Sequence, residues 1–292
     1  MLELIALDAI SDRDTFFAEA GQQVEILFVN SSTRVPIEMV NQLSSLRLIA
    51  ILGAGYDMVD VIHARSRKIA ITTGRGVNRD DVADMAIGLL LATVRLIGSG
   101  DRLVRSGGWE RPLPLPQARS LCDLNYGVIG MGSIGSTIAN RLSIFGRPIR
   151  WWGPRPKDVP WERAGSLVGL AEASDVLIVA CRADASTKHL VTAAVLQALG
   201  NRGFLINISR GNVIDEAALI ESLRHRTIAG AGLDVFAEEP TNPALWAELD
   251  QVVLMPHVGG WAERGMRLAE EALVENVRRY LGKEPLLTPL EI

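Results

Sequence analysis

This sequence of 292 residues contains few cysteines and histidines, has no excess of basic charge, and has no long uninterrupted apolar run. Its two cysteines, Cys122 and Cys181, form no CxxC pair and have no histidine motif nearby, so we expect no metal site and a reducing compartment, the cytoplasm. The net charge of −4 gives no electrostatic reason to expect nucleic acid or an anionic membrane as a partner. The first residues carry acid where a signal peptide carries base. The longest apolar stretch, residues 82–98, contains Asp84 and Arg95 and is too short to span a bilayer, so it predicts a buried helix.

Short apolar runs alternate along the chain with amphipathic segments long enough to form helices. The runs are apolar throughout, which is typical of strands in parallel sheets with both faces covered. They are too numerous for one compact unit, so we expect two doubly wound α/β domains. We place the domain boundary after residue 77 and expect the final helix to return to the first domain. The first domain then comprises residues 1–77 and 263–292, and the second comprises residues 78–262. The predicted strands are residues 4–7, 25–29, 47–52, 69–72, 126–129, 149–152, 176–180, 204–208, 229–233 and 252–255.

The strongest motif is GxGxxG, which follows a predicted strand and opens a predicted helix. In that context Gly130 permits a tight turn, Gly132 lets the backbone approach a pyrophosphate, and Gly135 lets helix and strand pack closely. The backbone N–H groups of Ser133 and Ile134 would face the pyrophosphate at the helix N-terminus, where the helix dipole favours negative charge. The segment therefore predicts a dinucleotide site of the Rossmann type.

The end of the next predicted strand is expected to select the cofactor. Enzymes that use NAD usually carry an acid there, which binds the ribose hydroxyls. Here that position is Gly153, and Arg155 lies two residues further on. A missing carboxylate removes repulsion toward a 2′-phosphate, and a guanidinium can bind that phosphate with two hydrogen bonds. The segment favours NADP(H) over NAD(H), with Arg182 as a further candidate at the adenosine end; the alternative is that Arg155 and Lys157 only form a solvated loop.

Three residues suited to the reduction of a carbonyl group follow later strands. Arg210, Glu239 and His257 each lie beyond the carboxyl end of a predicted strand, the edge at which open α/β sheets bind ligands. Histidine titrates near neutrality and is the natural proton donor to an alkoxide. A carboxylate bonded to the other ring nitrogen would hold the ring and favour its charged form. An arginine can polarise the carbonyl group and bind a substrate carboxylate.

Taken together, these segments resemble the D-isomer-specific 2-hydroxyacid dehydrogenase family, and the resemblance covers essentially the whole chain. In that family the arginine, glutamate and histidine have the roles just described, and here they stand in the same order. The resemblance also implies that Asp234 binds the nicotinamide amide, a role that the backbone carbonyl near Ile208 often shares.

A second matching stretch lies directly after the third predicted strand. By resemblance, the backbone N–H groups of Gly53, Ala54 and Gly55 receive the substrate carboxylate, and small residues suit this role because a bare backbone can approach an anion closely. Arg75 stands where many members have proline. It is a candidate contact for the substrate carboxylate, and the alternative is a partly exposed arginine beside the hinge.

Two positions depart from the pattern of the family, and a third lies in a loop whose role differs among relatives. Asp184 replaces a threonine that contacts the pyrophosphate in relatives, so that contact is expected to be lost. Trp261 stands where relatives usually have a small residue, and either lines the substrate pocket or fills core. Trp109 lies in a loop that relatives can project toward the neighbouring subunit's site.

The resemblance implies a flavodoxin-like substrate domain, a Rossmann domain, an active-site cleft between them, and a homodimer. The implied reaction is the reduction of glyoxylate, hydroxypyruvate or a related 2-keto acid by NADPH, as in the glyoxylate/hydroxypyruvate reductase branch. A hydroxyphenylpyruvate- or phenylpyruvate-type reductase is an alternative. Glu239 argues against formate dehydrogenase, whose histidine pairs with a glutamine. A dinucleotide-sensing binding protein, like the family's transcriptional corepressors, is the alternative from another class.

Overall fold

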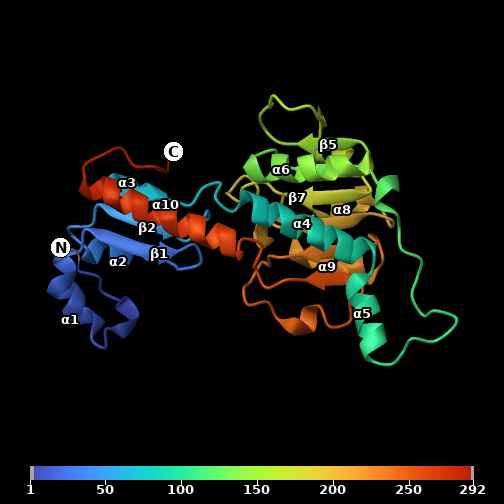
Figure 1. The fold of residues 1–292 in the computed structure, drawn as a ribbon, viewed down its shortest axis with the longest axis horizontal. Helices are drawn as coiled ribbons and strands as arrows, with labels where there is room; N and C mark the ends of the chain where they lie inside the picture. Colours follow the sequence, from blue (N-terminus) through green and yellow to red (C-terminus); the bar gives the residue numbers. More distant parts are fainter. Residues whose placement is uncertain (1–2, 291–292) are drawn as a thin grey trace. The chain divides into compact units, whose positions relative to one another are not determined.

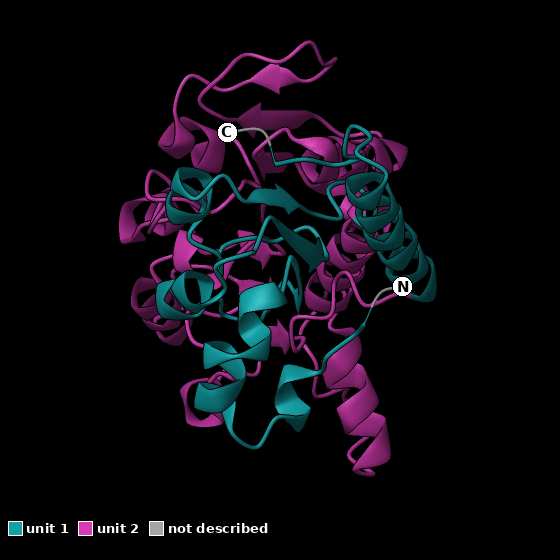
Figure 2. Ribbon diagram, turned by 90° about the vertical axis from the view of Figure 1, so that its left-hand side faces the viewer, with its two compact units in different colours: residues 1–78, 263–292 teal, residues 79–262 magenta. Residues whose placement is uncertain are grey.

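The computed structural model describes residues 3–290. The chain divides into two compact units, residues 1–78 with 263–292 and residues 79–262 (Figure 2). Each unit contains one parallel sheet with helices packed against it, which confirms the predicted α/β class.

The sheet of the first unit has three parallel strands in the order β1-β2-β3 (Figure 1). In β2, Leu48 and Ala50 pack against Val277 of α10, whereas Ile49 and Ile51 lie in the cluster that includes side chains of α2 and α3. Both faces of this strand are therefore covered, which explains its uninterrupted apolar run. The bounds in this unit are α1 Arg13–Ala18, β1 Ile26–Asn30, α2 Ile37–Gln42, β2 Leu48–Leu52, α3 Val61–Ser66, β3 Ala70–Thr72 and α10 Glu263–Leu281.

The second unit contains a seven-stranded parallel sheet in the order β10-β9-β8-β7-β4-β5-β6. Counted from β4, this is the 3-2-1-4-5-6 order of a Rossmann fold with one strand added beyond the sixth. The order reverses between β4 and β7, which makes their carboxyl ends the switch point at which such sheets bind ligands. The strands are β4 Tyr126–Ile129, β5 Ile149–Trp152, β6 Glu162–Arg163, β7 Val176–Val179, β8 Phe204–Asn207, β9 Gly230–Leu233 and β10 Val252–Leu254, and the helices are α4 Arg79–Val94, α5 Ile97–Arg105, α6 Ser133–Leu142, α7 Leu167–Glu172, α8 Ala193–Leu199 and α9 Glu216–Arg224.

Two apolar layers cover the faces of this sheet. Side chains of α4 and α6 pack against one face, on residues that include Val128 and Ile178. Side chains of α7, α8 and α9 pack against the other face, on residues that include Leu177 and Val179. Neighbouring residues of β7 thus point into different layers, and both layers exclude water.

The prediction of a strand at residues 4–7 is wrong. Leu4 is 82% exposed, and the chain turns into a short 3-10 helix, Leu7–Ala9. No strand lies beside this run among the described residues, so its backbone has no ladder to join.

The single apolar helix predicted over residues 82–98 is also wrong in its extent. Helix α4 ends at Val94, Leu96 adopts a left-handed backbone conformation with φ of 57°, and α5 continues at an angle of 61° to α4. The apolar periodicity runs through this break and therefore gives no sign of it. No single described helix is long and apolar enough to cross a membrane, and only this bent pair meets that criterion, by length and composition alone.

Asp175 links three segments at the start of the larger sheet. Its carboxylate accepts hydrogen bonds from the Asn125 N–H at 2.8 Å and from the Arg119 guanidinium at 2.7 Å, and its backbone carbonyl accepts the Phe204 N–H at 2.9 Å. Burial raises the pKa of this carboxyl group, but the hydrogen bonds and the charges of Arg119 and Arg202 outweigh burial and lower it below 3.8.

We predict that Asp175→Asn lowers the free energy of unfolding at pH 7 by roughly 1–3 kcal/mol, because Arg119 loses its ionic acceptor. The folded-state pKa is depressed, so the stabilisation is present above pH 3.8 and is lost as the pH falls through the lower, folded-state value. Urea unfolding between pH 7 and pH 3 should show a difference from wild type that shrinks in acid. Asp123→Asn, at an exposed carboxylate nearby, is the control; an equal loss in both variants would contradict the assignment.

Candidate functional site

The glycine-rich turn after β4 is shaped by contacts that two of its three glycines require. Gly130 has φ of 93°, and an added Cβ would overlap the Cys181 backbone; a Cβ on Gly135 would overlap the Gly130 carbonyl oxygen. A Cβ on Gly132 would meet nothing within 4 Å, so the space beside this residue is open. Packing therefore explains why Gly130 and Gly135 are glycines. Gly132 has no such packing reason and suits a ligand that approaches the backbone.

Helix α6 begins at this open position. Its N-cap, Gly132, provides no side-chain hydrogen bond, so the first N–H groups, those of Ser133 and Ile134, remain available to an anion. The turn and the helix start together fit a dinucleotide pyrophosphate.

The end of β5 is fixed by a residue that sequence reasoning missed. The buried Gly153 carbonyl accepts hydrogen bonds from Nε and Nη2 of Arg163, at 3.2 Å and 2.7 Å. Arg155 and Lys157 extend into solvent, and within residues 3–290 the Arg155 side chain has no hydrogen-bond or ion-pair partner. The predicted phosphate-binding arginine is thus uncommitted, and the loop that carries it is held at its base.

Beyond β7 the chain makes a compact turn that explains Asp184. One Asp184 oxygen accepts the Ser186 N–H at 2.9 Å and the Ser186 hydroxyl at 2.6 Å, and these bonds lower the pKa of Asp184. The Asp184 carboxylate thereby stabilises the turn in which it lies. The Arg182 backbone carbonyl accepts the Thr187 hydroxyl at 3.0 Å in the same turn, and its side chain is exposed.

The loops after β9 and β10 bring Glu239 and His257 together. Nδ1 of His257 lies 2.6 Å from Oε2 of Glu239, and Oε1 of Glu239 accepts the Phe236 N–H at 3.0 Å. Burial raises the pKa of Glu239, but the bonds to His257 and Phe236 and the charge of Arg210 lower it overall, so the carboxylate is ionised at neutral pH. Nε2 of His257 has no partner in the described part of the chain, and the side chain is 40% exposed. This nitrogen is therefore free to act on a ligand.

Arg210 follows β8 and lies near the same loop. A Cβ on Gly211 would overlap the backbone of Phe236 and Ala237, so only glycine lets these two backbones approach so closely. The Arg210 guanidinium donates to the Ser209 carbonyl at 2.8 Å, and its charge acts on Glu239. The structure thus brings the three predicted catalytic residues to one edge of one sheet.

Asp234, at the end of β9, holds the backbone that follows His257. Its two oxygens accept the N–H groups of Val258 and Gly259 at 2.9 Å and 2.8 Å, and the residue is only 2% exposed. Burial is the largest influence on this carboxyl group and raises its pKa, against the two hydrogen bonds. The N–H of the buried Ile208 donates to the Val179 carbonyl at 3.4 Å, and its own carbonyl accepts no hydrogen bond within residues 3–290.

The candidate substrate residues of the first unit form a local group. The Gly74 N–H donates to the Gly53 carbonyl at 2.6 Å, which places Arg75 close to the turn at 53–55. The N–H groups of Gly53, Ala54 and Gly55 have no acceptor among the described residues, and the Arg75 side chain is exposed. The turn therefore offers free donors beside a cation.

Both tryptophans singled out from the sequence lie at the surface. Trp261 is 75% exposed and Trp109 is 66% exposed. The interpretation of Trp261 as a core residue is therefore wrong, because a core side chain would be shielded from solvent.

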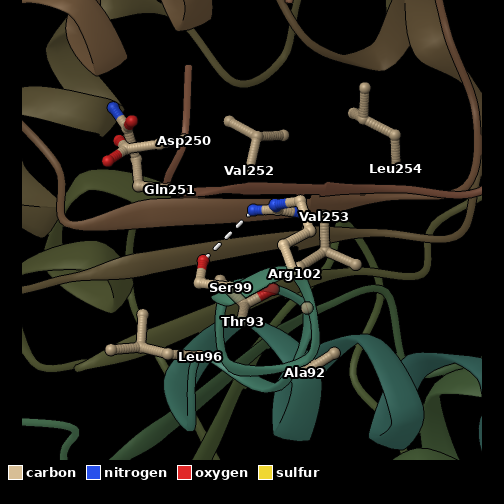
Figure 3. Close-up of a pocket in the computed structure, with 11 residues that line it drawn as sticks. Ala92, Thr93, Leu96, Ser99, Arg102, Asp250, Gln251, Val252, Val253 and Leu254 are labelled. Atoms are coloured by element: carbon tan, nitrogen blue, oxygen red, sulfur yellow. Dashed lines mark hydrogen bonds between the residues drawn. The ribbon is translucent and has the colours of Figure 1, made fainter. Parts of the chain in front are cut away.

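A cavity of about 290 Å³ lies elsewhere in this unit, between α5 and β10 (Figure 3). Its only hydrogen bond between the drawn side chains joins Arg102 to Ser99, at 3.2 Å. None of the catalytic candidates lines it. Its walls are formed by Ala92, Thr93, Leu96, Gly98, Ser99, Arg102, Asp250, Gln251, Val252, Val253 and Leu254.

A Rossmann sheet with an open glycine turn at its switch point and a histidine–carboxylate pair at the same edge defines a dinucleotide-binding oxidoreductase. The sequence profile of the D-isomer specific 2-hydroxyacid dehydrogenase, NAD binding domain, matches residues 87–259. The chain belongs to the D-isomer specific 2-hydroxyacid dehydrogenase family.

Individual relatives cover nearly the whole chain. A hydroxyphenylpyruvate reductase of Plectranthus scutellarioides is 35% identical over 94% of this chain and 88% of its own length. A glyoxylate/hydroxypyruvate reductase of Arabidopsis thaliana is 33% identical over 95% and 86%. The structure of an NADPH-dependent glyoxylate/hydroxypyruvate reductase from Sinorhizobium meliloti, in complex with NADP and malonate, is similar with a TM-score of 0.88, at 38% identity over 93% of this chain and 85% of that one.

We predict that Gly132→Ala and Gly135→Ala separate binding from folding. Gly132→Ala should leave the melting temperature within about 1 °C of wild type but weaken dinucleotide binding at least about tenfold, because its methyl group enters open space beside the helix start. Gly135→Ala should lower the melting temperature itself, because its methyl group overlaps the Gly130 carbonyl. Thermal unfolding and calorimetric titration measure the two effects. Unchanged dinucleotide affinity in Gly132→Ala would refute the proposed path of the pyrophosphate.

Proposed function

We propose that this protein reduces a small 2-keto acid, such as glyoxylate or hydroxypyruvate, to the 2-hydroxy acid with NADPH. The observation that carries the proposal is the 2.6 Å contact between His257 and Glu239, which leaves Nε2 of the histidine free. Relatives whose names specify reduction of glyoxylate and hydroxypyruvate support the substrate class.

The reaction requires a proton and a fixed substrate. A bound reduced nicotinamide supplies the hydride. The imidazolium form of His257 donates its Nε2 proton to the keto oxygen as charge develops there and is left as the neutral imidazole. The Glu239 carboxylate stabilises the imidazolium before this transfer and holds the ring. Arg210 polarises the carbonyl group and binds the substrate carboxylate.

The residues of the second unit hold the dinucleotide at several points. The turn at Gly130, Gly132 and Gly135 and the N–H groups of Ser133 and Ile134 bind the pyrophosphate. The Asp234 carboxylate and the Ile208 carbonyl accept from the nicotinamide amide. At the adenosine end, Gly153, Arg155 and Arg182 accommodate the 2′-phosphate, and this part of the assignment makes NADPH the preferred cofactor over NADH.

We assign the substrate-binding role to the first unit and the dinucleotide-binding role to the second. In the first unit, the free N–H groups of Gly53, Ala54 and Gly55 bind the substrate carboxylate, and Arg75 adds positive charge beside them.

An aromatic 2-keto acid is the second candidate substrate. Trp261 exposes 75% of its surface four residues beyond His257, and a large apolar ring in water favours contact with an apolar substrate group. The similarity to a hydroxyphenylpyruvate reductase supports this alternative. A protein that binds the dinucleotide only as a sensor is the candidate from another class.

Oxidation of NADPH, followed by its absorbance, tests these assignments with glyoxylate, hydroxypyruvate, pyruvate and phenylpyruvate in turn, and with NADH in parallel. We expect turnover with NADPH well above NADH. His257→Ala should lower kcat by roughly 10²–10⁴-fold and change the NADPH dissociation constant by less than about threefold. His225→Ala, at an exposed histidine of the same unit, is the control.

The pattern of rates distinguishes the candidates. A wild-type rate in His257→Ala would contradict the proton-donor assignment. Faster turnover of phenylpyruvate than of glyoxylate, lost selectively in Trp261→Ala, would favour the aromatic substrate. Tight dinucleotide binding with no turnover of any acid would favour the sensor.

We also propose a homodimer in which α5 and the loop after it face a second copy. Ile97, Val104, Trp109 and Leu113 in this segment are each more than half exposed, and such a group of apolar side chains is typical of an interface. Sedimentation should show a dimer for wild type and more monomer for Val104→Glu. Val274→Glu, at an exposed valine of α10, is the control, and a monomeric wild type would contradict the proposal.

A further inference from the structure

Arg163, one of the two residues of β6, contacts the Gly153 carbonyl and the Trp151 ring. Its guanidinium donates from Nε and Nη2 to the Gly153 carbonyl, and its central carbon lies 5.8 Å from the centre of the Trp151 ring, within the range of a cation–π contact. Trp151 is only 2% exposed, and its indole N–H donates to the Trp161 carbonyl at 3.0 Å. The guanidinium of Arg163 therefore lies against a buried ring whose own N–H group is hydrogen-bonded.

The Arg163 guanidinium binds the backbone at the position that selects the cofactor in Rossmann folds. Gly153 stands at the end of β5, where enzymes that use NAD carry the acid that binds the ribose hydroxyls. Arg163 and Trp151 are register partners in the parallel pair of β6 and β5, so their side chains share one face of the sheet. Trp151 packs with Ile138 and Leu142 of α6 on that face, which is the face covered by the helix of the glycine turn.

Arg163 also keeps donors and charge for a ligand. Nη1 has no hydrogen-bond partner in the described part of the chain, and the residue is exposed. No carboxylate among residues 3–290 forms an ion pair with it; its neighbour Glu162 is bound by Arg150 at 2.8 Å. Its charge is therefore available beside the strand end.

We infer that Arg163 is a specificity-determining residue for the cofactor: it fixes the Gly153 carbonyl and directs its remaining N–H groups to the 2′-phosphate of NADPH, next to Arg155. The inference rests on the proposed preference for NADPH. The same site disfavours an acid at position 153, because a Cβ there would lie 3.2 Å from Cζ3 of Trp151. A carboxylate introduced at that point would also pair with the Arg163 guanidinium and remove the phosphate's partner.

Calorimetric titration of the full chain with NADPH and with NADH, without substrate, tests the inference in Arg163→Gln. We expect the NADPH dissociation constant to rise at least about tenfold and that of NADH less than about twofold, because only the former loses a charged hydrogen bond. Titration with adenosine 2′,5′-bisphosphate and with AMP isolates the phosphate and should show the same contrast. Arg150→Gln, which removes the neighbouring arginine from its pair with Glu162, is the matched control and should preserve the ratio.

Arg163→Lys retains the charge without the fork, and it should give an intermediate ratio; it also tests the inference if the glutamine variant unfolds. Equal weakening of NADPH and NADH in both variants would overturn the inference and leave Arg163 as a support of the loop only. An unchanged ratio in a protein that prefers NADPH would overturn it while the proposed function stands. A wild-type protein that binds NADH more tightly would contradict the cofactor assignment of the proposed function itself.

Discussion

The parallel direction of all seven strands in the larger sheet is the constraint on which the site depends. Parallel strands end at one edge, and the loops that follow six of these seven strands each carry a residue of the candidate site. No single segment contains the site, so its geometry follows from strand register rather than from any one loop. The residues after successive strands are Gly130 after β4, Gly153 after β5, Arg182 after β7, Arg210 after β8, Asp234 after β9 and His257 after β10.

Two carboxylates fix His257 from different directions. Glu239 binds the ring through Nδ1, and Asp234 binds the backbone through the N–H groups of Val258 and Gly259. His257 itself has φ of 56°, a left-handed backbone conformation that is uncommon for residues with a side chain. The N–H groups of Val258 and Gly259, directly after this residue, donate to Asp234 and hold the backbone there, so main chain and side chain together orient the ring.

Local patterns predicted what local physics determines. The glycine turn, the bounds of β4 and β5 and the start of α10 follow from apolar runs and from backbone positions that only glycine can occupy. Arg163 escaped prediction because its role depends on β6, a strand of two exposed residues, and on a cross-strand contact with Trp151. The bend at Leu96 escaped for the opposite reason, since the apolar pattern there continues unchanged through a left-handed residue.

The environment of Asp234 constrains how a nicotinamide can bind. Each of its oxygens already accepts one backbone N–H, and a carboxylate oxygen can accept a second hydrogen bond. The proposed contact with the nicotinamide amide would therefore use the remaining acceptor capacity of a group that also shapes the His257 loop. Burial opposes ionisation of this carboxyl group, and a further N–H donor would favour its charged form. Dinucleotide binding and the placement of the proton donor would then be coupled through one buried carboxylate.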